Sequence, residues 1–278
     1  MLSYRHSFHS GNHADVLKHL LLLSVLQKLG AKDKAYSYID SHSGAGLYDL
    51  QSANALMNVE HETGVSRLWR QSFTHPLLQD YLACVGSFNK DNQLHYYPGS
   101  PAVAQWASRA QDRLQLLDLQ TEELEILRQF LGRDERISIH QRDAFEGLLA
   151  LTPPEPRRGL VLIDPSYEDK ADYQRVVNIV RKLHRRWPVG VIAIWYPLLG
   201  KARDKGVWLK ETLAKEEVNG LSSYELSVGE QSEEFGMHGS GMLLVNTPWQ
   251  TQDQMQGAFD EALPLLGATT KFAIKTLR

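Results

Sequence analysis

The alternation of apolar and polar positions divides this chain into short apolar runs and longer amphipathic segments. Runs with the length and aliphatic content of buried strands occur at residues 35–39, 114–117, 136–140, 159–163 and 189–195. Helical spacing occupies the intervals, at residues 14–29, 102–110, 121–131 and 173–187. Two more strands are expected at 222–228 and 241–248, with a helix at 255–266. Strands that alternate with helices predict an α/β fold with a doubly wound, mostly parallel sheet.

The interval between the first two strands is longer than a single crossover helix requires. Residues 47–96 contain helical patterns at 64–72 and 75–89, and we find no good strand pattern among them. We therefore expect one α/β domain formed by residues 1–46 and 97–278. An inserted helical subdomain at 47–96 interrupts it.

Carboxylates follow four of the predicted strands. Asp40, Asp118, Asp143 and Asp164 each stand where an apolar run ends. A single aspartate in such a place is usually a cap or a turn residue. In a doubly wound sheet, however, ligands bind outside the carboxyl ends of the strands, so four aspartates at this edge indicate a ligand site.

The sharpest motif is Asp164-Pro165-Ser166-Tyr167, which follows the run at 159–163. It differs by one residue from the D-P-P-Y signature of enzymes that methylate amino groups. An exocyclic adenine amine must become more tetrahedral before its lone pair can attack a methyl sulfonium. The Asp164 carboxylate and the Pro165 carbonyl can accept its two N–H groups, and Tyr167 can stack on the base. A plain turn is the alternative interpretation of the same four residues.

A second motif, residues 40–46, reads D-S-H-S-G-A-G and follows the first strand. Its glycines let the backbone approach a ligand closely. A dinucleotide-binding turn would need a third glycine at position 49, where Asp49 stands, so the turn favours S-adenosylmethionine over a nicotinamide cofactor. Asp118 is then expected to bind ribose hydroxyls, and Asp143 with Ala144 to hold the adenine ring of the cofactor.

Composition narrows the class of protein further. The chain has 278 residues, 42% of them hydrophobic, a net charge of −3 and one cysteine, Cys84, which excludes an internal disulfide and a cysteine-based zinc site. The apolar run at 20–26 is too short to cross a membrane, and we find no secretory signal, so we expect a cytoplasmic protein. Four histidines, His6, His9, His13 and His19, lie close together in the sequence. We expect no metal there, because Gly11 and Asn12 break any helix between His9 and His13 and methyl transfer needs no Lewis acid.

With a negative net charge, any nucleic-acid site must be a local patch. Basic residues gather at 181–186 and again between Lys201 and Lys210. A solvated helix face explains the first group equally well. Together the two groups could supply phosphate contacts.

The four blocks F-H-S-G-N-H-A-D-V-L-K-H (8–19), D-S-H-S-G-A-G (40–46), Y-P-G-S-P (97–101) and D-P-S-Y-E (164–168) resemble the RlmJ family. Its members are bacterial 23S rRNA adenine-N6 methyltransferases, and the resemblance covers essentially the whole chain. It implies a class I S-adenosylmethionine-dependent methyltransferase fold, Rossmann-like, with a mostly parallel seven-stranded sheet and a small helical insertion. It also implies that 23S rRNA is the substrate, and we expect the protein to be a monomer.

The resemblance assigns roles to individual residues. Asp164 would orient or deprotonate the amine, and Tyr4 would contact the RNA substrate. Lys18 would reach the carboxylate of the cofactor. The residues implied to contact S-adenosylmethionine are His19, His42, Ser100, Asp118, Asp143, Ala144 and Asp164.

Two positions depart from the expected pattern. Ser166 replaces the second proline of the D-P-P-Y loop, and Asp118 stands where glutamate is also expected. Two alternatives stay open at this point. One is a DNA adenine-N6 methyltransferase, since such loops serve both polymers. The other is a non-catalytic RNA-binding protein with a decayed methyltransferase fold, for which Ser166 would be the warning sign.

Overall fold

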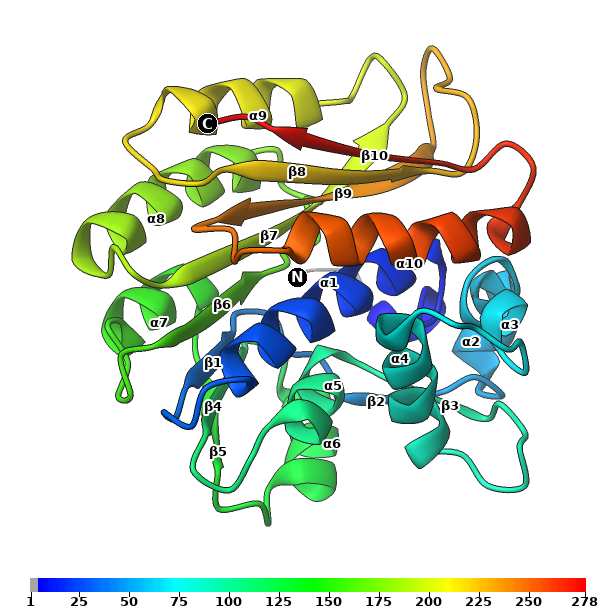
Figure 1. The fold of residues 1–278 in the computed structure, drawn as a ribbon, viewed down its shortest axis with the longest axis horizontal. Helices are drawn as coiled ribbons and strands as arrows, with labels where there is room; N and C mark the ends of the chain where they lie inside the picture. The colour runs from blue at the N-terminus through cyan, green and yellow to red at the C-terminus, as the bar shows by residue number, and fades with distance from the viewer. Residues whose placement is uncertain (1–4) are drawn as a thin grey trace.

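A computed structural model describes residues 5–278 of the chain, and within this range the main sheet has eight strands (Figure 1). Five strands run parallel in the order β5-β4-β1-β6-β7, and three antiparallel strands extend the sheet beyond β7 as β9-β8-β10. The parallel strands are β1 (Ser37–Asp40), β4 (Arg113–Asp118), β5 (Ile137–Gln141), β6 (Gly159–Ile163) and β7 (Val191–Leu199). The antiparallel strands are β8 (Ser222–Ser227), β9 (Met237–Val245) and β10 (Lys271–Thr276).

This topology confirms the predicted doubly wound sheet. The chain leaves β1 in one direction to β4 and β5, and returns past β1 to β6 and β7, so a crevice opens at the carboxyl end of β1. The eighth strand is β10, which the sequence pattern did not predict. It lies at the edge of the sheet, its side chains alternate between exposed and half-buried, and it carries Lys271 and Lys275 in place of an apolar run.

Helices cover both faces of the sheet (Figure 1). The apolar strand β6 explains why, since Leu160 and Leu162 belong to one core and Val161 and Ile163 to the other. The first core is covered by α1 (His13–Gly30), α5 (Ser100–Ala107), α6 (Thr121–Leu131) and α10 (Thr251–Leu266). The second is covered by α7 (Ala144–Leu151), α8 (Asp172–Arg186) and α9 (Gly206–Lys215).

Helix α1 is buried on nearly every side and begins at the crevice. The Asn12 side chain caps it by accepting hydrogen bonds from the backbone N–H groups of Ala14 (2.9 Å) and Asp15 (3.0 Å). A helix that is buried all round must pack against several elements, and α1 contacts α4 (Pro76–Ser87), α5, α10 and β9. The short 3-10 helix η1 (His6–Phe8) precedes it, so the histidine-rich start of the chain lies beside the crevice.

The segment after β1 contains α2 (Ala53–Asn58), η2 (Glu60–Thr63), α3 (Val65–Leu68) and α4 (Pro76–Ser87). The prediction that residues 47–96 contain no strand was wrong at the two ends of this segment. There β2 (Leu47–Asp49) pairs antiparallel with β3 (Tyr96–Pro98). A three-residue strand is too short to show an alternating pattern. The segment packs on α1 and α10, and its separation from the α/β domain as a subdomain stays a prediction.

No helix in residues 5–278 has both the length and the apolar character that crossing a lipid bilayer requires.

Candidate active site

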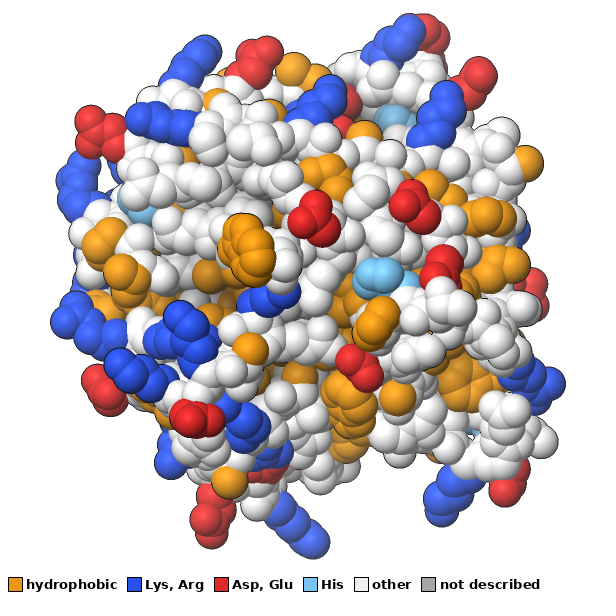
Figure 2. All heavy atoms as spheres, viewed as in Figure 1, with side chains coloured by type: hydrophobic (Ala, Val, Ile, Leu, Met, Phe, Trp, Pro, Cys, Tyr) orange, Lys and Arg blue, Asp and Glu red, His pale blue; other side chains and the backbone are white. Residues whose placement is uncertain are grey.

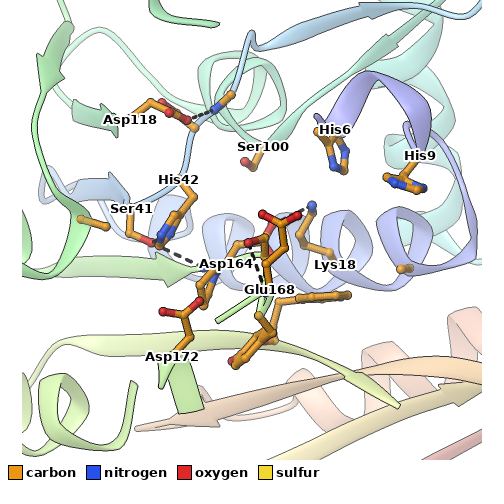
Figure 3. A pocket seen from close by; sticks show the side chains of 18 of the residues that line it. His6, His9, Lys18, Ser41, His42, Ser100, Asp118, Asp164, Glu168 and Asp172 are labelled. Carbon is orange, nitrogen blue, oxygen red and sulfur yellow. Dashed lines mark hydrogen bonds and ion pairs between the residues drawn. The ribbon is translucent and has the colours of Figure 1, made fainter. Parts of the chain in front are cut away.

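A cavity of about 640 Å³ opens at the carboxyl ends of the parallel strands. Its size is typical of sites that enclose small molecules, which occupy roughly 300–1,000 Å³. Figure 3 shows Asp118 and His42 on one side, Lys18, His6 and His9 on the other, and Asp164 between them. The walls therefore come from η1, α1 and the ends of β1, β4 and β6.

Most of the predicted site residues line this cavity. They are Lys18, His42, Ser100, Asp118, Asp143, Ala144, Asp164 and Tyr167. Tyr4 lies outside the described residues. Three of the four strand-end aspartates reach the cavity directly. The fourth, Asp40, is fully buried behind Ser100.

His19 is fully buried and is not among the residues that line the cavity. Its ring stacks on Tyr97 at a centroid distance of 5.5 Å, and its Nδ1 lies 2.8 Å from the Tyr97 hydroxyl. Burial lowers the pKa of His19 to about 3, so the ring is neutral at physiological pH. The structure therefore gives His19 a place in the core under the cavity, and its contact with the cofactor stays a prediction.

The glycine turn is fastened to the end of β4. Gly44 and Gly46 have φ angles of +57° and +80°, values that favour glycine, and the Gly44 N–H donates to Asp118 Oδ2 at 2.8 Å. The Gln120 N–H donates to Asp118 Oδ1 at 2.9 Å. Two backbone donors thus fix this carboxylate, and each oxygen keeps a lone pair for a further donor from the cavity.

Behind the turn, Asp40 accepts two short hydrogen bonds on the same oxygen. The Tyr38 hydroxyl and the Ser100 hydroxyl each lie 2.6 Å from Asp40 Oδ2. Burial raises the pKa of Asp40 to about 6, against the opposing effect of these two donors. Because the Ser100 hydroxyl already donates its proton to Asp40, only its oxygen lone pairs are available to the cavity. Ser100 therefore suits a ligand group that donates hydrogen bonds, such as an ammonium group.

The Asp164 carboxylate is joined to α1 by Lys18. The Lys18 ammonium lies 2.9 Å from Asp164 Oδ2 and 2.8 Å from Asp15 Oδ1, and all three side chains are largely buried. Asp15 Oδ2 in turn accepts from the Gly11 N–H at 2.9 Å and lies 3.0 Å from His6 Nε2. Burial alone would raise the pKa of Asp15, but His6 and Lys18 outweigh it and hold the pKa well below its usual value.

Tyr167 is held firmly in the loop after β6. Its φ is +55°, an uncommon value for a side chain of this size, and its hydroxyl donates to the Trp195 carbonyl at 2.8 Å. Its ring centroid lies 4.4 Å from that of Tyr173 and 6.0 Å from that of Trp195. The ring is 8% exposed, so only one edge or part of one face reaches the cavity, and base stacking by Tyr167 stays a prediction.

His42 lies beside the turn with its Nδ1 2.7 Å from Ser41 Oγ and its ring edge-on to Phe145. Burial lowers the pKa of His42, which favours the neutral ring. Within the part of the chain that the structure describes, no group of three or more His, Cys, Asp or Glu side chains is arranged to hold a metal ion.

Several residues of the cavity wall had no predicted role in the site. They include His6, Asp15, Glu60 and Glu123. Glu123 Oε2 is buried without a hydrogen-bond partner among residues 5–278. Burial and the neighbouring Asp118 raise the pKa of Glu123. Asp15 belongs to the N-terminal block (8–19), where it could have been noticed, and His6 was considered only as a possible metal ligand. Glu123 carried no signal, because it stands in an ordinary amphipathic helix.

Comparison with known proteins decides the family. A family model described as "Ribosomal RNA large subunit methyltransferase D, RlmJ" matches residues 33–270. The protein named ribosomal RNA large subunit methyltransferase J from Escherichia coli K12 is 42% identical over 255 residues, which cover 92% of this chain and 90% of that protein. The chain belongs to the RlmJ family.

A second RlmJ relative, from Haemophilus influenzae Rd, carries the same name and is 38% identical over 97% of this chain and 94% of its own length. A crystal structure of a protein from Legionella pneumophila Philadelphia 1 superposes with a TM-score of 0.88 at 29% identity, covering 96% of this chain and 98% of that one. The predicted RlmJ resemblance and the class I methyltransferase fold are thus confirmed, with an eighth strand at the sheet edge.

Proposed function

We propose that this RlmJ-family chain transfers a methyl group from S-adenosylmethionine to the N6 amine of an adenine in 23S rRNA. Relatives named as methyltransferases of the large-subunit ribosomal RNA support the substrate class. The observation that carries the proposal is the position of Asp164, a carboxylate at the end of β6 that lines the cavity beside the Pro165 carbonyl.

The residues present suit S-adenosylmethionine. Glu123 has a buried oxygen without a hydrogen-bond partner in the described range 5–278, and it lies on the side of the cavity where Asp118 keeps free lone pairs, so the two can accept from ribose hydroxyls. Ser100 can accept from the α-ammonium group, and Asp143 and Ala144 lie where the next strand ends. When bound, the cofactor supplies an electrophilic methyl group on a sulfonium.

The chain's own residues then position the amine. Lys18 holds Asp164 Oδ2, which leaves Oδ1 to accept one N–H of the adenine amine, while the Pro165 carbonyl accepts the other. Both bonds draw the nitrogen away from the plane of the ring and aim its lone pair at the methyl group. The surplus proton on the methylated nitrogen passes to Asp164, which already accepts a hydrogen bond from that nitrogen.

The target base must leave its helix to reach this cavity, because an amine inside a duplex is inaccessible. Tyr167 is proposed to offer the base an aromatic surface. Tyr4 is proposed to contact the RNA, which is compatible with the position of η1, the segment just after it, at the cavity wall. The protein is proposed to act as a monomer and without a metal.

Label transfer tests the function. The wild type is incubated with methyl-labelled S-adenosylmethionine and separate pools of 23S rRNA, tRNA and duplex DNA, and the labelled nucleoside is identified after digestion. We expect N6-methyladenosine from 23S rRNA alone, and its loss by at least about 100-fold in Asp164→Ala. Label in DNA, or label on another atom, would overturn the proposal. The melting temperature of the same variant separates lost chemistry from lost folding.

A further inference from the structure

The basic stretch of α8 forms a straight stripe that starts at the cavity. Arg175, Asn178, Lys182, Arg185 and Arg186 are all exposed, and at 3.6 residues per turn they fall within an arc of about 100° on one side of the helix. The opposite side, with Val176, Val180 and Leu183 among its residues, packs into the second core. The stripe is therefore about 17 Å long, at 1.5 Å per residue.

A groove runs beside this stripe and adjoins the main cavity. It has a volume of about 390 Å³ and lies between α7 and α8. Asp143, Phe145 and Arg175 line both the groove and the cavity, so the two spaces adjoin at these residues. Leu149 and Ile179 give the groove an apolar floor, and Asn178 and Lys182 form its wall on the α8 side.

Charge along the stripe is incompletely compensated. Arg175 lies 3.4 Å from Asp172 and 3.8 Å from Asp169. Arg181, just beside the stripe, is bound by Glu216. By contrast, within residues 5–278 no ion pair is formed by Lys182, Arg185 or Arg186. These three cations give the helix face a local positive charge in a chain of net charge −3, and such a charge attracts anions.

The acidic residues of the groove lie on the other wall. Glu146 and Asp143 belong to α7 and its cap, where the Asp143 carboxylate accepts from the Glu146 N–H at 3.0 Å. A polyanion would avoid this wall and follow α8. Figure 2 shows Lys and Arg side chains along the left and lower-left margin of the molecule, where α8 ends and the parallel strands begin.

We propose that the RNA strand flanking the target nucleotide leaves the cavity through the α7–α8 groove, with its phosphates on Lys182, Arg185 and Arg186. The inference rests on the proposed function and adds the path of the substrate to it. Cations spaced along a helix beside an apolar floor suit single-stranded RNA, because the backbone meets the cations while unstacked bases meet the floor. Arg175, at the junction, receives the strand as it leaves the cavity.

The test compares two variants with equal loss of charge. The stripe variant is Lys182→Gln/Arg185→Gln/Arg186→Gln, and the control is Lys215→Gln/Lys271→Gln/Lys275→Gln, which removes three exposed lysines elsewhere. Each is assayed on two RNA substrates that share one target site. One extends by at least ten nucleotides on either side, and the other is trimmed to the target and its nearest neighbours.

For the long substrate, the stripe variant should raise Kd and KM by at least about tenfold and reduce the slope of log K against log salt by about 2, while kcat at saturation persists. The short substrate, S-adenosylmethionine affinity and melting temperature should stay at wild-type values, and the control should match the wild type throughout. Equal behaviour of the stripe and control variants would overturn the inference, and so would a loss confined to S-adenosylmethionine affinity, which would assign the groove to the cofactor. If the wild type methylates neither RNA, the proposed function itself has failed.

Discussion

The Lys18 ammonium lies between two carboxylates that are far apart in the sequence, 2.9 Å from Asp164 and 2.8 Å from Asp15. It therefore joins the first turn of the central helix to the loop expected to hold the amine. Removing one partner of a buried ion pair leaves the other charge without compensation, which usually lowers the free energy of unfolding by about 3–5 kcal/mol. The geometry of the reacting carboxylate and the stability of α1 thus depend on one side chain.

Lys18→Met should accordingly reduce both turnover and stability. We expect kcat to fall by at least about 100-fold, because Asp164 is free to rotate away from the amine. Denaturant titration should show a loss of about 3–5 kcal/mol. Lys28→Met, on the same helix but partly exposed, is the control and should change neither quantity. The double variant Lys18→Met/Asp164→Asn should recover part of the lost stability, and strict additivity would contradict the pairing.

Glu123→Gln should separate binding from stability. Since burial raises the pKa of Glu123, its ionised form is disfavoured in the folded chain, and an uncharged amide should leave the melting temperature unchanged or higher at pH 7. Affinity for S-adenosylmethionine should fall several-fold while kcat is retained, because the amide accepts a ribose hydroxyl less strongly. Glu122→Gln is the matched control, since Glu122 is exposed and contacts Arg5. An unchanged affinity in Glu123→Gln would remove this residue from the site.

Asp40 predicts a pH dependence of stability. Its pKa is raised to about 6 in the folded chain against an ordinary value of 3.8, so the folded chain takes up a proton first as the pH falls. The contribution of this group to stability therefore rises as the pH drops from 7 through 6 towards 4, by at most about 3 kcal/mol. Asp40→Asn can still accept from Tyr38 and Ser100 and should flatten that part of the profile, whereas Asp33→Asn, at the surface, should not.

The pair of His9 and Glu60 predicts a contribution to stability that falls as the pH increases. Its hydrogen bond at 2.8 Å raises the pKa of His9 despite partial burial, so the pair stabilises the contact between the N-terminal segment and η2 fully below pH 6.5. The contribution is lost as the pH rises through the raised value. Hydrogen exchange of residues 5–12 should accelerate between pH 6 and 8 beyond its intrinsic rate. Glu60→Gln should abolish this extra change, and Glu62→Gln, exposed on the same turn, should keep it.

The parallel core could be predicted because its strands are short apolar runs, and four of the five end at an aspartate or just before one. Strand β6 shows this most clearly, since all five of its residues are buried. Strands β2 and β10 could not be found, because one has three residues and the other lies half-exposed at the edge. A local sequence pattern identifies a strand that is buried on both faces. It does not identify a short or exposed strand that forms because a neighbouring strand pairs with it.

Likewise, one part of the candidate site could be predicted from the sequence and another part could not. The aspartates at strand ends were predictable, because topology alone brings the carboxyl ends of parallel strands together. The partnership of Lys18 with Asp164 was not, since it spans 146 positions and depends on how α1 lies across the sheet. His19, four residues after Asp15 on the buried helix, packs on Tyr97, and only the three-dimensional arrangement distinguishes it from Lys18.

The charge of the cavity wall affects the release of the demethylated cofactor after the reaction. Carboxylates outnumber lysine and arginine there by nine to two. Methyl transfer turns a sulfonium cation into an uncharged thioether, so the reaction removes the positive charge that this wall attracts. In a partly desolvated site that difference is worth more than it would be in water. On the proposed function, the wall therefore retains the methyl donor more tightly than the demethylated product, which weakens product inhibition.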